Sequence, residues 1–128
     1  FLEERALSPI RILTKHEFFD YHAKYQDDAT QYVFDTRLPD ATLAHCVKDA
    51  TRAYHLLGCR DLGRVDLIVD DAGVPWLLEI NTIPGFTSHS LLPKAAAHEG
   101  IAFEQVVDRL AQQAFRRALA ARRLSKAV

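Results

Sequence analysis

The chain has 128 residues, 48% of them hydrophobic, which is enough for one domain with a core and too few for two. Its 16 basic and 17 acidic side chains leave a formal net charge of -1, so no overall field favours a nucleic-acid or membrane partner. No apolar run approaches the roughly 20 residues of a spanning helix. The two cysteines, Cys46 and Cys59, favour reduced thiols and a cytoplasmic protein. Because the first residue is Phe1, we expect the chain to be part of a larger protein.

The first third of the chain predicts a short strand followed by an unusual loop. Residues 7–13 have strand composition, and Pro9 restricts that strand to a sheet edge or to its own beginning. Residues 14–38 keep neither a helical nor a strand period, although they are rich in tyrosine and phenylalanine. Long loops in compact domains are usually functional or disordered, and aromatic content argues against disorder. We therefore expect 14–38 to be a functional loop.

The remaining elements follow from hydrophobic spacing. Apolar residues between 43 and 57 recur at threes and fours, which predicts a helix with Pro39 in its first turn and Gly58 just past its end. Alternating residues then predict a hairpin, with strands over 64–70 and 75–81 and a turn at 71–74. A short helix over 89–98 and a last helix beginning near residue 103 complete an α+β fold, with a mainly antiparallel sheet and flanking helices.

The predicted hairpin has one polar face and one apolar face. Period two places Arg64, Asp66, Ile68 and Asp70 on one face of the first strand. On the second strand it separates Leu77, Glu79 and Asn81 from Trp76, Leu78 and Ile80, and the latter set is predicted to face the core with Val65, Leu67 and Val69. A turn of two or four residues places Asp66 opposite Glu79 and Arg64 opposite Asn81.

Two carboxylates that face one another are unfavourable unless a cation lies nearby. Directly opposed Cβ atoms are only about 4.5–5.5 Å apart. Asp66, Glu79 and the carboxamide of Asn81 offer hard oxygen ligands of the kind that Mg²⁺ or Mn²⁺ takes. We therefore predict a metal site on the hairpin. The alternative is a solvated face whose carboxylates pair with Arg64, and the hairpin alone does not decide between the two.

Four further motifs resemble those of D-alanine-D-alanine ligases, which are ATP-grasp enzymes. They occur in that family's order and at its spacings: FFDYHAKY at 18–25, GRVD at 63–66, LEINTIPG at 78–85 and TSHSLLP at 87–93. The resemblance extends from about residue 7 to about residue 110. It implies that residues 1–128 are the C-terminal part of the ATP-grasp catalytic domain, with a metal-binding hairpin at 63–81 and an active-site loop at 14–38. The family's N-terminal and central domains are not present in these residues.

The resemblance also implies an activity. Members of the family ligate two D-alanines through an acyl phosphate for peptidoglycan synthesis, and they use ATP and Mg²⁺ or Mn²⁺ in the cytoplasm. It implies substrates rather than nucleic acid or membrane as partners, together with the missing domains of the same enzyme. Because half of a phosphoryl-transfer site should not turn over, we expect this segment alone to be inactive. A homodimer of the full-length protein stays open.

Site residues carry over at the matching positions. Asp66, Glu79 and Asn81 resemble the metal ligands, in agreement with the hairpin argument. Arg64 and the N-H of Gly85 resemble the groups that stabilise the tetrahedral intermediate. The resemblance assigns the remaining roles as follows: Lys24 to the ATP phosphates, Tyr25 to a hydrogen-bonded network that closes the site, and Ser90 with the amide of Leu91 to the carboxylate of the second substrate.

Departures from the family pattern leave the second substrate open. Phe19 stands where the family commonly has tyrosine, and His22 where it commonly has glutamate, while Ile83 and Phe86 change the surroundings of the turn at Gly85. A ligase that uses D-lactate or D-serine is therefore an alternative. A second alternative is a module that binds a cation or a nucleotide without catalysis. A third takes the basic helical tail at 116–128 as a contact for an anionic surface.

Overall fold

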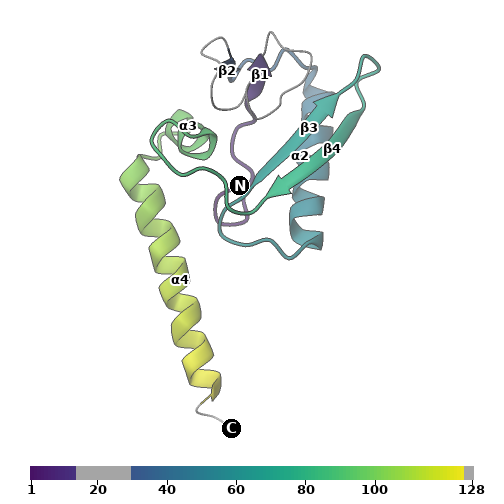
Figure 1. The fold of residues 1–128 in the computed structure, drawn as a ribbon. Coiled ribbons are helices and arrows are strands. Elements are labelled where there is room, and N and C mark those ends of the chain that lie inside the picture. The colour runs from purple at the N-terminus through teal and green to yellow at the C-terminus, as the bar shows by residue number, and fades with distance from the viewer. Residues whose placement is uncertain (14–29, 126–128) are drawn as a thin grey trace.

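The computed structural model describes residues 1–13 and 30–125, and these form an α+β fold (Figure 1). Two antiparallel hairpins alternate with helices in the order β1 (Arg11–Leu13), β2 (Gln31–Val33), α2 (Asp40–Leu56), β3 (Arg64–Val69), β4 (Pro75–Asn81), α3 (Leu91–His98) and α4 (Phe103–Ser125). Helix α2 lies against β3 and β4, and α4 extends away from the rest of the fold. No helix in the described part of the chain is long and apolar enough to cross a membrane. The predicted antiparallel pairing with flanking helices is confirmed.

The first hairpin differs from the prediction. Strand β1 covers only Arg11–Leu13 and begins after Pro9, so the predicted strand over 7–13 was too long. It pairs with β2, where Ile12 lies opposite Tyr32, so a strand occurs inside the segment predicted to be a loop. A three-residue strand is too short to display a period, and its pairing partner decides its conformation. Residues 14–29 lie outside the described residues.

Helix α2 confirms the predicted helix and its end before Gly58, but it begins after Pro39, and Leu57 of the predicted apolar spacing is exposed. Pro39 is its N-cap residue, with φ -55° and ψ 145°, and Gly58 has a φ of +65° just past its end, as a glycine there allows. Cys46, Ala50 and Tyr54 follow one another at spacings of four and are buried. This row packs α2 against the second hairpin and so fixes the position of β3 and β4.

A separate core joins α3 and α4 to the start of the chain. Helix α3 ends before Gly100, whose φ is +78°, and α4 begins at Phe103 as predicted. The rings of Phe86 and Phe103 lie 5.4 Å apart between centroids, which links the loop after β4 to α4. The buried residues of this core are Leu2, Leu7, Leu92, Ala95, Ala96, Ile101 and Val106.

The first two residues extend the ladder at the beginning of β3. The α-amino group of Phe1 donates to the carbonyl of Gly63 at 2.7 Å, and the N-H of Gly63 donates back to the carbonyl of Phe1 at 3.3 Å. Leu2 bridges Leu62 in antiparallel fashion. The Phe1 ring stacks on Tyr54 with centroids 4.4 Å apart. The amine is thereby held in a largely buried position, and burial lowers its pKa to about 6, with the nearby positive charge of Arg5 adding to the effect and Glu99 opposing it.

We expect this amine to make the stability of the 128-residue chain depend on pH. Its pKa is about 6 when folded against 8.0 ordinarily, so the unfolded chain binds more protons between these values and the free energy of unfolding rises with pH there. The gain is at most roughly 2–3 kcal/mol at about 1.36 kcal/mol per pKa unit. Urea unfolding at pH 5.5 to 8.5 measures it. Acetylation of Phe1 is the control and should remove this part of the slope; an identical slope in the acetylated chain would contradict the prediction.

Candidate metal and substrate site

The second hairpin places Asp66 opposite Glu79 and Arg64 opposite Asn81, as predicted. The route to this register differs from the prediction. Near the turn Val69 pairs with Pro75, and Asp70 and Val74 are joined by a hydrogen bond around a turn of three residues, in which Gly73 has a φ of +79°. That turn alone would shift the pairing by one residue. A β-bulge at Leu78 restores it, because two residues of β4 then lie against one residue of β3.

The bulge also changes which apolar side chains face α2. Between the turn and the bulge, Ile68 pairs with Trp76, and Leu67 pairs with Leu77. Trp76 therefore lies on the face of Ile68 and Asp70, where its indole N-H donates to Asp70 at 2.9 Å, and it is 60% exposed. The prediction that Trp76 faces the core was wrong, since a one-residue shift exchanges the faces of a strand. Asp70 is confirmed as a turn residue, because its Oδ1 accepts from Ala72 and Val74.

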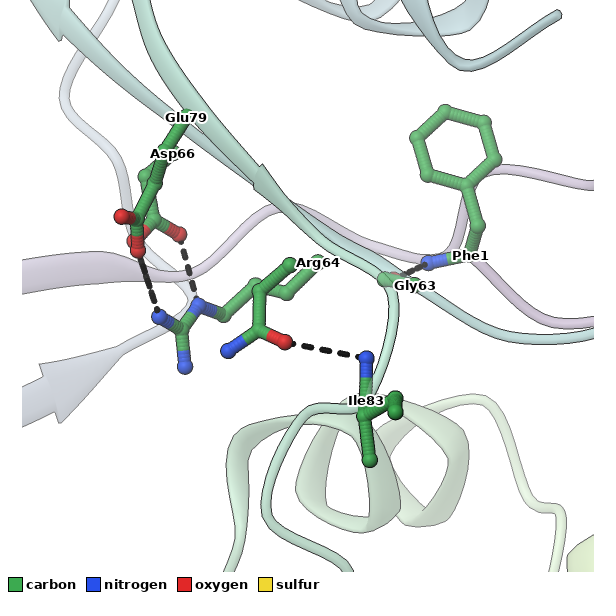
Figure 2. Close-up of polar contacts among 7 residues, drawn as sticks. Phe1, Gly63, Arg64, Asp66, Glu79 and Ile83 are labelled. Atoms are coloured by element: carbon green, nitrogen blue, oxygen red, sulfur yellow. Dashed lines mark hydrogen bonds and ion pairs between the residues drawn. The ribbon is translucent and has the colours of Figure 1, made fainter. Parts of the chain in front are cut away.

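Arg64 joins the two opposed carboxylates (Figure 2). Its Nε donates to Asp66 Oδ1 at 2.7 Å and its Nη2 to Asp66 Oδ2 at 3.0 Å. The same Nη2 donates to Glu79 Oε1 at 3.2 Å. Burial alone would lower the pKa of Arg64, but the hydrogen bonds and charges of Asp66 and Glu79 outweigh it, so that the pKa is raised. In this structure Arg64 pairs with both carboxylates and offsets one of their two negative charges, which agrees with the alternative interpretation of the hairpin.

The donor set of this face fits a hard divalent cation. Asp66 and Glu79 form one rung of the ladder, and Asn81 belongs to a rung two positions away on the same face. All three side chains offer oxygen, which Mg²⁺ prefers. Among the described residues no three histidine, cysteine or acidic side chains gather as a ligand set, so the third ligand would be the carboxamide. The Oδ1 of Asn81 accepts the N-H of Ile83 at 3.0 Å. This bond orients the carboxamide and uses one of its two lone pairs.

The loop after β4 brings Gly85 and Ser90 together. A Cβ built on Gly85 would lie 3.3 Å from Ser90 Oγ, so a side chain at position 85 would crowd this hydroxyl. Ser90 is the N-cap residue of α3 but makes no side-chain cap hydrogen bond. Its Oγ instead accepts the N-H of Thr87 at 3.0 Å and lies 3.0 Å from Thr87 Oγ1. The hydroxyl is thus turned toward the loop, which differs from an ordinary helix cap.

Thr87 is a residue that the sequence reasoning missed. It fixes the Ser90 hydroxyl through two contacts, and its carbonyl accepts the N-H of Ser90 at 2.9 Å. The available signal was the occurrence of two hydroxyl residues three apart in a loop, since Ser and Thr side chains commonly bond nearby backbone N-H groups.

Two predicted site residues cannot be placed, and the basic tail is partly accounted for. Lys24 and Tyr25 lie outside the described residues. The tail predicted at 116–128 is the end of α4, which is helical to Ser125. Arg117 in this segment pairs with Asp61, which precedes β3. This arginine therefore takes part in an ion pair within the fold.

Comparison with known proteins places the chain in the family that the motifs resemble. The family model described as "D-ala D-ala ligase C-terminus" matches residues 2–112. A D-alanine-D-alanine ligase of Citrifermentans bemidjiense is 44% identical over 113 residues, which cover 88% of this chain and 37% of that protein. One of Marinobacter nauticus is 49% identical over 112 residues, covering 85% and 34%. The chain therefore spans about a third of the length of these relatives.

Solved structures agree with the sequence relatives. A D-alanine-D-alanine ligase of Bacillus anthracis, crystallised with ATP, has a TM-score of 0.75 and 31% identity over 91% of this chain and 36% of that one. The VanG D-Ala:D-Ser ligase of Enterococcus faecalis has a TM-score of 0.63 and 33% identity over 80% of this chain and 29% of that one.

Proposed function

We propose, on the premise that this chain belongs to the family of D-alanine-D-alanine ligase C-termini, that it is the C-terminal part of an enzyme that joins two D-alanines at the expense of ATP. The observation that carries the proposal is the hairpin, where Arg64, Asp66 and Glu79 form one cluster on the face that also bears Asn81. A scaffold hairpin has no need of opposed carboxylates. The product would enter peptidoglycan synthesis.

In this proposal the hairpin serves the phosphates and the carboxylate that reacts with them. Asp66, Glu79 and Asn81 would hold Mg²⁺, which when bound supplies charge neutralisation for the nucleotide. Arg64 holds both carboxylates in place through three hydrogen bonds. With its remaining donors it would stabilise the oxyanion that develops when the second amine attacks.

The loop at Gly85 and Ser90 would bind the second substrate. The N-H of Gly85 would donate to the oxyanion, and the Ser90 hydroxyl with the N-H of Leu91 would bind the substrate carboxylate. The first N-H groups of α3, from Leu91 and Leu92, have no partner within the helix, and such groups favour an anion. The hydroxyl is already turned away from the capping position by Thr87. Lys24 and Tyr25 would complete the nucleotide side as the resemblance implies.

The nature of the second substrate rests on the relatives. Curated relatives at 44–49% identity are named D-alanine-D-alanine ligases, whereas the D-Ala:D-Ser ligase is a weaker structural match. D-alanine is therefore the substrate that we propose at both positions. The free thiols of Cys46 and Cys59 and the use of ATP support a cytoplasmic enzyme. Its partner is the remainder of the same polypeptide, because the chain spans about a third of the relatives' length.

The test compares the full-length protein encoded by the parent gene with the 128-residue chain. We expect phosphate release from ATP that depends on D-alanine and Mg²⁺ in the full-length protein, with D-alanyl-D-alanine as product. We expect none from the 128-residue chain, because it supplies only one side of the site. D-serine and D-lactate in the second position serve as comparison substrates. Turnover by the chain alone, or preference of the full-length enzyme for D-serine or D-lactate, would overturn the corresponding part of the proposal.

A further inference from the structure

The first turn of α3 has free N-H groups and no acidic side chain. The N-H of Ser90 donates back to the preceding loop at 2.9 Å, and that of Lys94 donates to the carbonyl of Ser90 at 3.0 Å. Pro93 has no N-H, so Leu91 and Leu92 supply the N-H groups that have no acceptor in the described part of the chain. An acidic side chain would compensate them, and this turn has none. The start of α3 is therefore electropositive.

Lys94 adds a full positive charge to this end of the helix. It follows Ser90 by four residues, so both side chains lie on one face of α3. Helical side chains lean toward the N-terminus, which directs the Lys94 side chain over the turn that begins at Ser90. A cation this close to the N-terminus opposes the helix dipole. The helix alone gives no reason for a cation here, whereas an anion bound at its start would.

An aromatic ring holds the Lys94 ammonium. Its Nζ lies 5.0 Å from the centroid of the Tyr32 ring, which is within the range of a cation-π contact. Lys94 is partly buried, and no carboxylate among the described residues forms an ion pair with it. The face of the ring attracts a cation without carrying a net charge. The positive charge of Lys94 is thus oriented by β2 and can still attract an anion.

A second ring contact holds the β2 segment on the same helix face (Figure 1). Phe34, two residues after Tyr32, stacks on His98 with ring centroids 3.8 Å apart and an interplanar angle of 4°. Lys94 and His98 are four residues apart and share one face of α3. The two rings therefore restrain the Lys94 side chain before any substrate binds, and such preorganisation lowers the entropic cost of binding.

We propose that Lys94 is a further binding residue for the second substrate, in which the ammonium, oriented by the Tyr32 ring, neutralises the substrate carboxylate at the start of α3. The inference rests on the proposed function, which assigns that carboxylate to the Ser90 hydroxyl and the N-H of Leu91. A helix N-terminus supplies only about half an elementary charge, and Lys94 supplies a whole one. The site thereby selects an anionic group and not merely a hydrogen-bond acceptor.

The test is Lys94→Met in the full-length enzyme encoded by the parent gene, with D-alanine or D-alaninamide as the second substrate. The amide keeps the attacking amine and replaces the carboxylate by a neutral group of similar size. We expect KM for the second D-alanine to rise at least about 5-fold with kcat unchanged, because the lost attraction acts equally on bound substrate and transition state. KM for D-alaninamide should stay within about twofold.

Further variants identify the cause of the change in KM. Lys94→Arg keeps the charge and the ring contact, so KM for D-alanine should stay within about threefold. Tyr32→Leu should raise this KM in the unchanged enzyme but not in the Lys94→Met background, because the ring acts through the ammonium. Tyr32→Phe retains a ring and should leave KM unchanged. Lys48→Met is the matched control, because it makes the same change on an exposed lysine of α2.

Ionic strength decides the matter if D-alaninamide reacts too slowly to be measured. KM for D-alanine should rise between about 0.05 and 0.5 M NaCl in the unchanged enzyme and stay nearly constant in Lys94→Met, since salt screens a charge pair. An equal rise in both enzymes would contradict the proposal.

An unchanged KM for D-alanine in Lys94→Met would also overturn the proposal. So would an equal rise for D-alanine and D-alaninamide, because the lysine would then act by packing, and so would an equal rise in Lys48→Met. In each of these cases the unchanged enzyme still ligates D-alanine, so the proposed function stands. Absence of that ligation would overturn the proposed function and this inference with it.

Discussion

Replacing Glu79 by glutamine in the full-length enzyme is expected to reduce ligase turnover at least about 100-fold while the stability of the 128-residue chain changes by less than about 0.5 kcal/mol. Glu79 is half exposed, and its bond to Arg64 is 3.2 Å long. Arg64 keeps its two bonds to Asp66 when that contact weakens. The same carboxylate is one of two that the proposed metal site requires, so activity and stability should respond very differently.

The measurements are thermal unfolding of the 128-residue chain in chelator and Mg²⁺-dependent phosphate release by the full-length enzyme. Asp71→Asn is the matched control, because it makes the same chemical change on an exposed carboxylate in the turn of the same hairpin. It should leave both quantities unchanged. Full activity of Glu79→Gln, or an equal loss in Asp71→Asn, would show that the carboxylate at 79 is not a metal ligand.

Asp66 has a structural role in addition to its proposed role as a metal ligand. From the sequence alone the opposed carboxylates are an electrostatic liability, so an amide at either position should leave the metal-free chain as stable or more stable. The structure changes that expectation for Asp66, because Arg64 binds it through two short bonds at a largely buried position. Asp66→Asn removes the charge that these two bonds depend on, and among the described residues Glu79 is then the carboxylate that still pairs with Arg64. Hydrogen bonds to charged groups contribute about 1.5–3 kcal/mol, so we expect this variant to be less stable. The pair is therefore better described as a cluster of three charges than as two.

The sequence predicts the parts of this fold that repeat a pattern over many residues. The helix around Cys46 and Tyr54 and the pairing of Asp66 with Glu79 follow from periods that extend over several turns or rungs. The pairing was predicted for an incomplete reason, because the three-residue turn and the bulge at Leu78 each shift the register by one and cancel. Turn length and bulges depend on local φ values and on packing against α2, which alternation does not encode.

The rest of the site depends on contacts between residues that no period relates. The convergence of Arg64 on both carboxylates requires a rotamer choice, and the bond of Asn81 to Ile83 depends on how the chain leaves β4. The contact between Thr87 and Ser90 could have been inferred from their spacing. Strand β2 could not, because three residues carry no period and its partner β1 is equally short. The sequence predicted an element correctly where its hydrophobic period extended over enough residues to exclude another secondary structure.

Gly63→Ala is expected to destabilise the chain by about 2–3 kcal/mol, which is at the upper end for an added methyl group in a packed site. A Cβ at this position would lie 2.8 Å from Cε2 of Tyr54, and the Tyr54 ring is fully buried and stacked on Phe1. Neither ring can move without opening the contact between α2 and the hairpin. Gly63 also exchanges backbone bonds with Phe1 and directly precedes Arg64, so the displacement would reach the carboxylate cluster.

Chemical denaturation of the 128-residue chain measures this loss, and two further variants identify its cause. Gly58→Ala places a Cβ in open space at a φ of +65°, so it should cost only the left-handed penalty of about 1 kcal/mol. Tyr54→Leu removes the ring that the new Cβ meets. The loss of stability in the double variant should therefore be smaller than the sum of the two single losses, by about 1 kcal/mol or more. Strict additivity of Gly63→Ala and Tyr54→Leu would show that the glycine is required for its backbone and not for the space beside Tyr54.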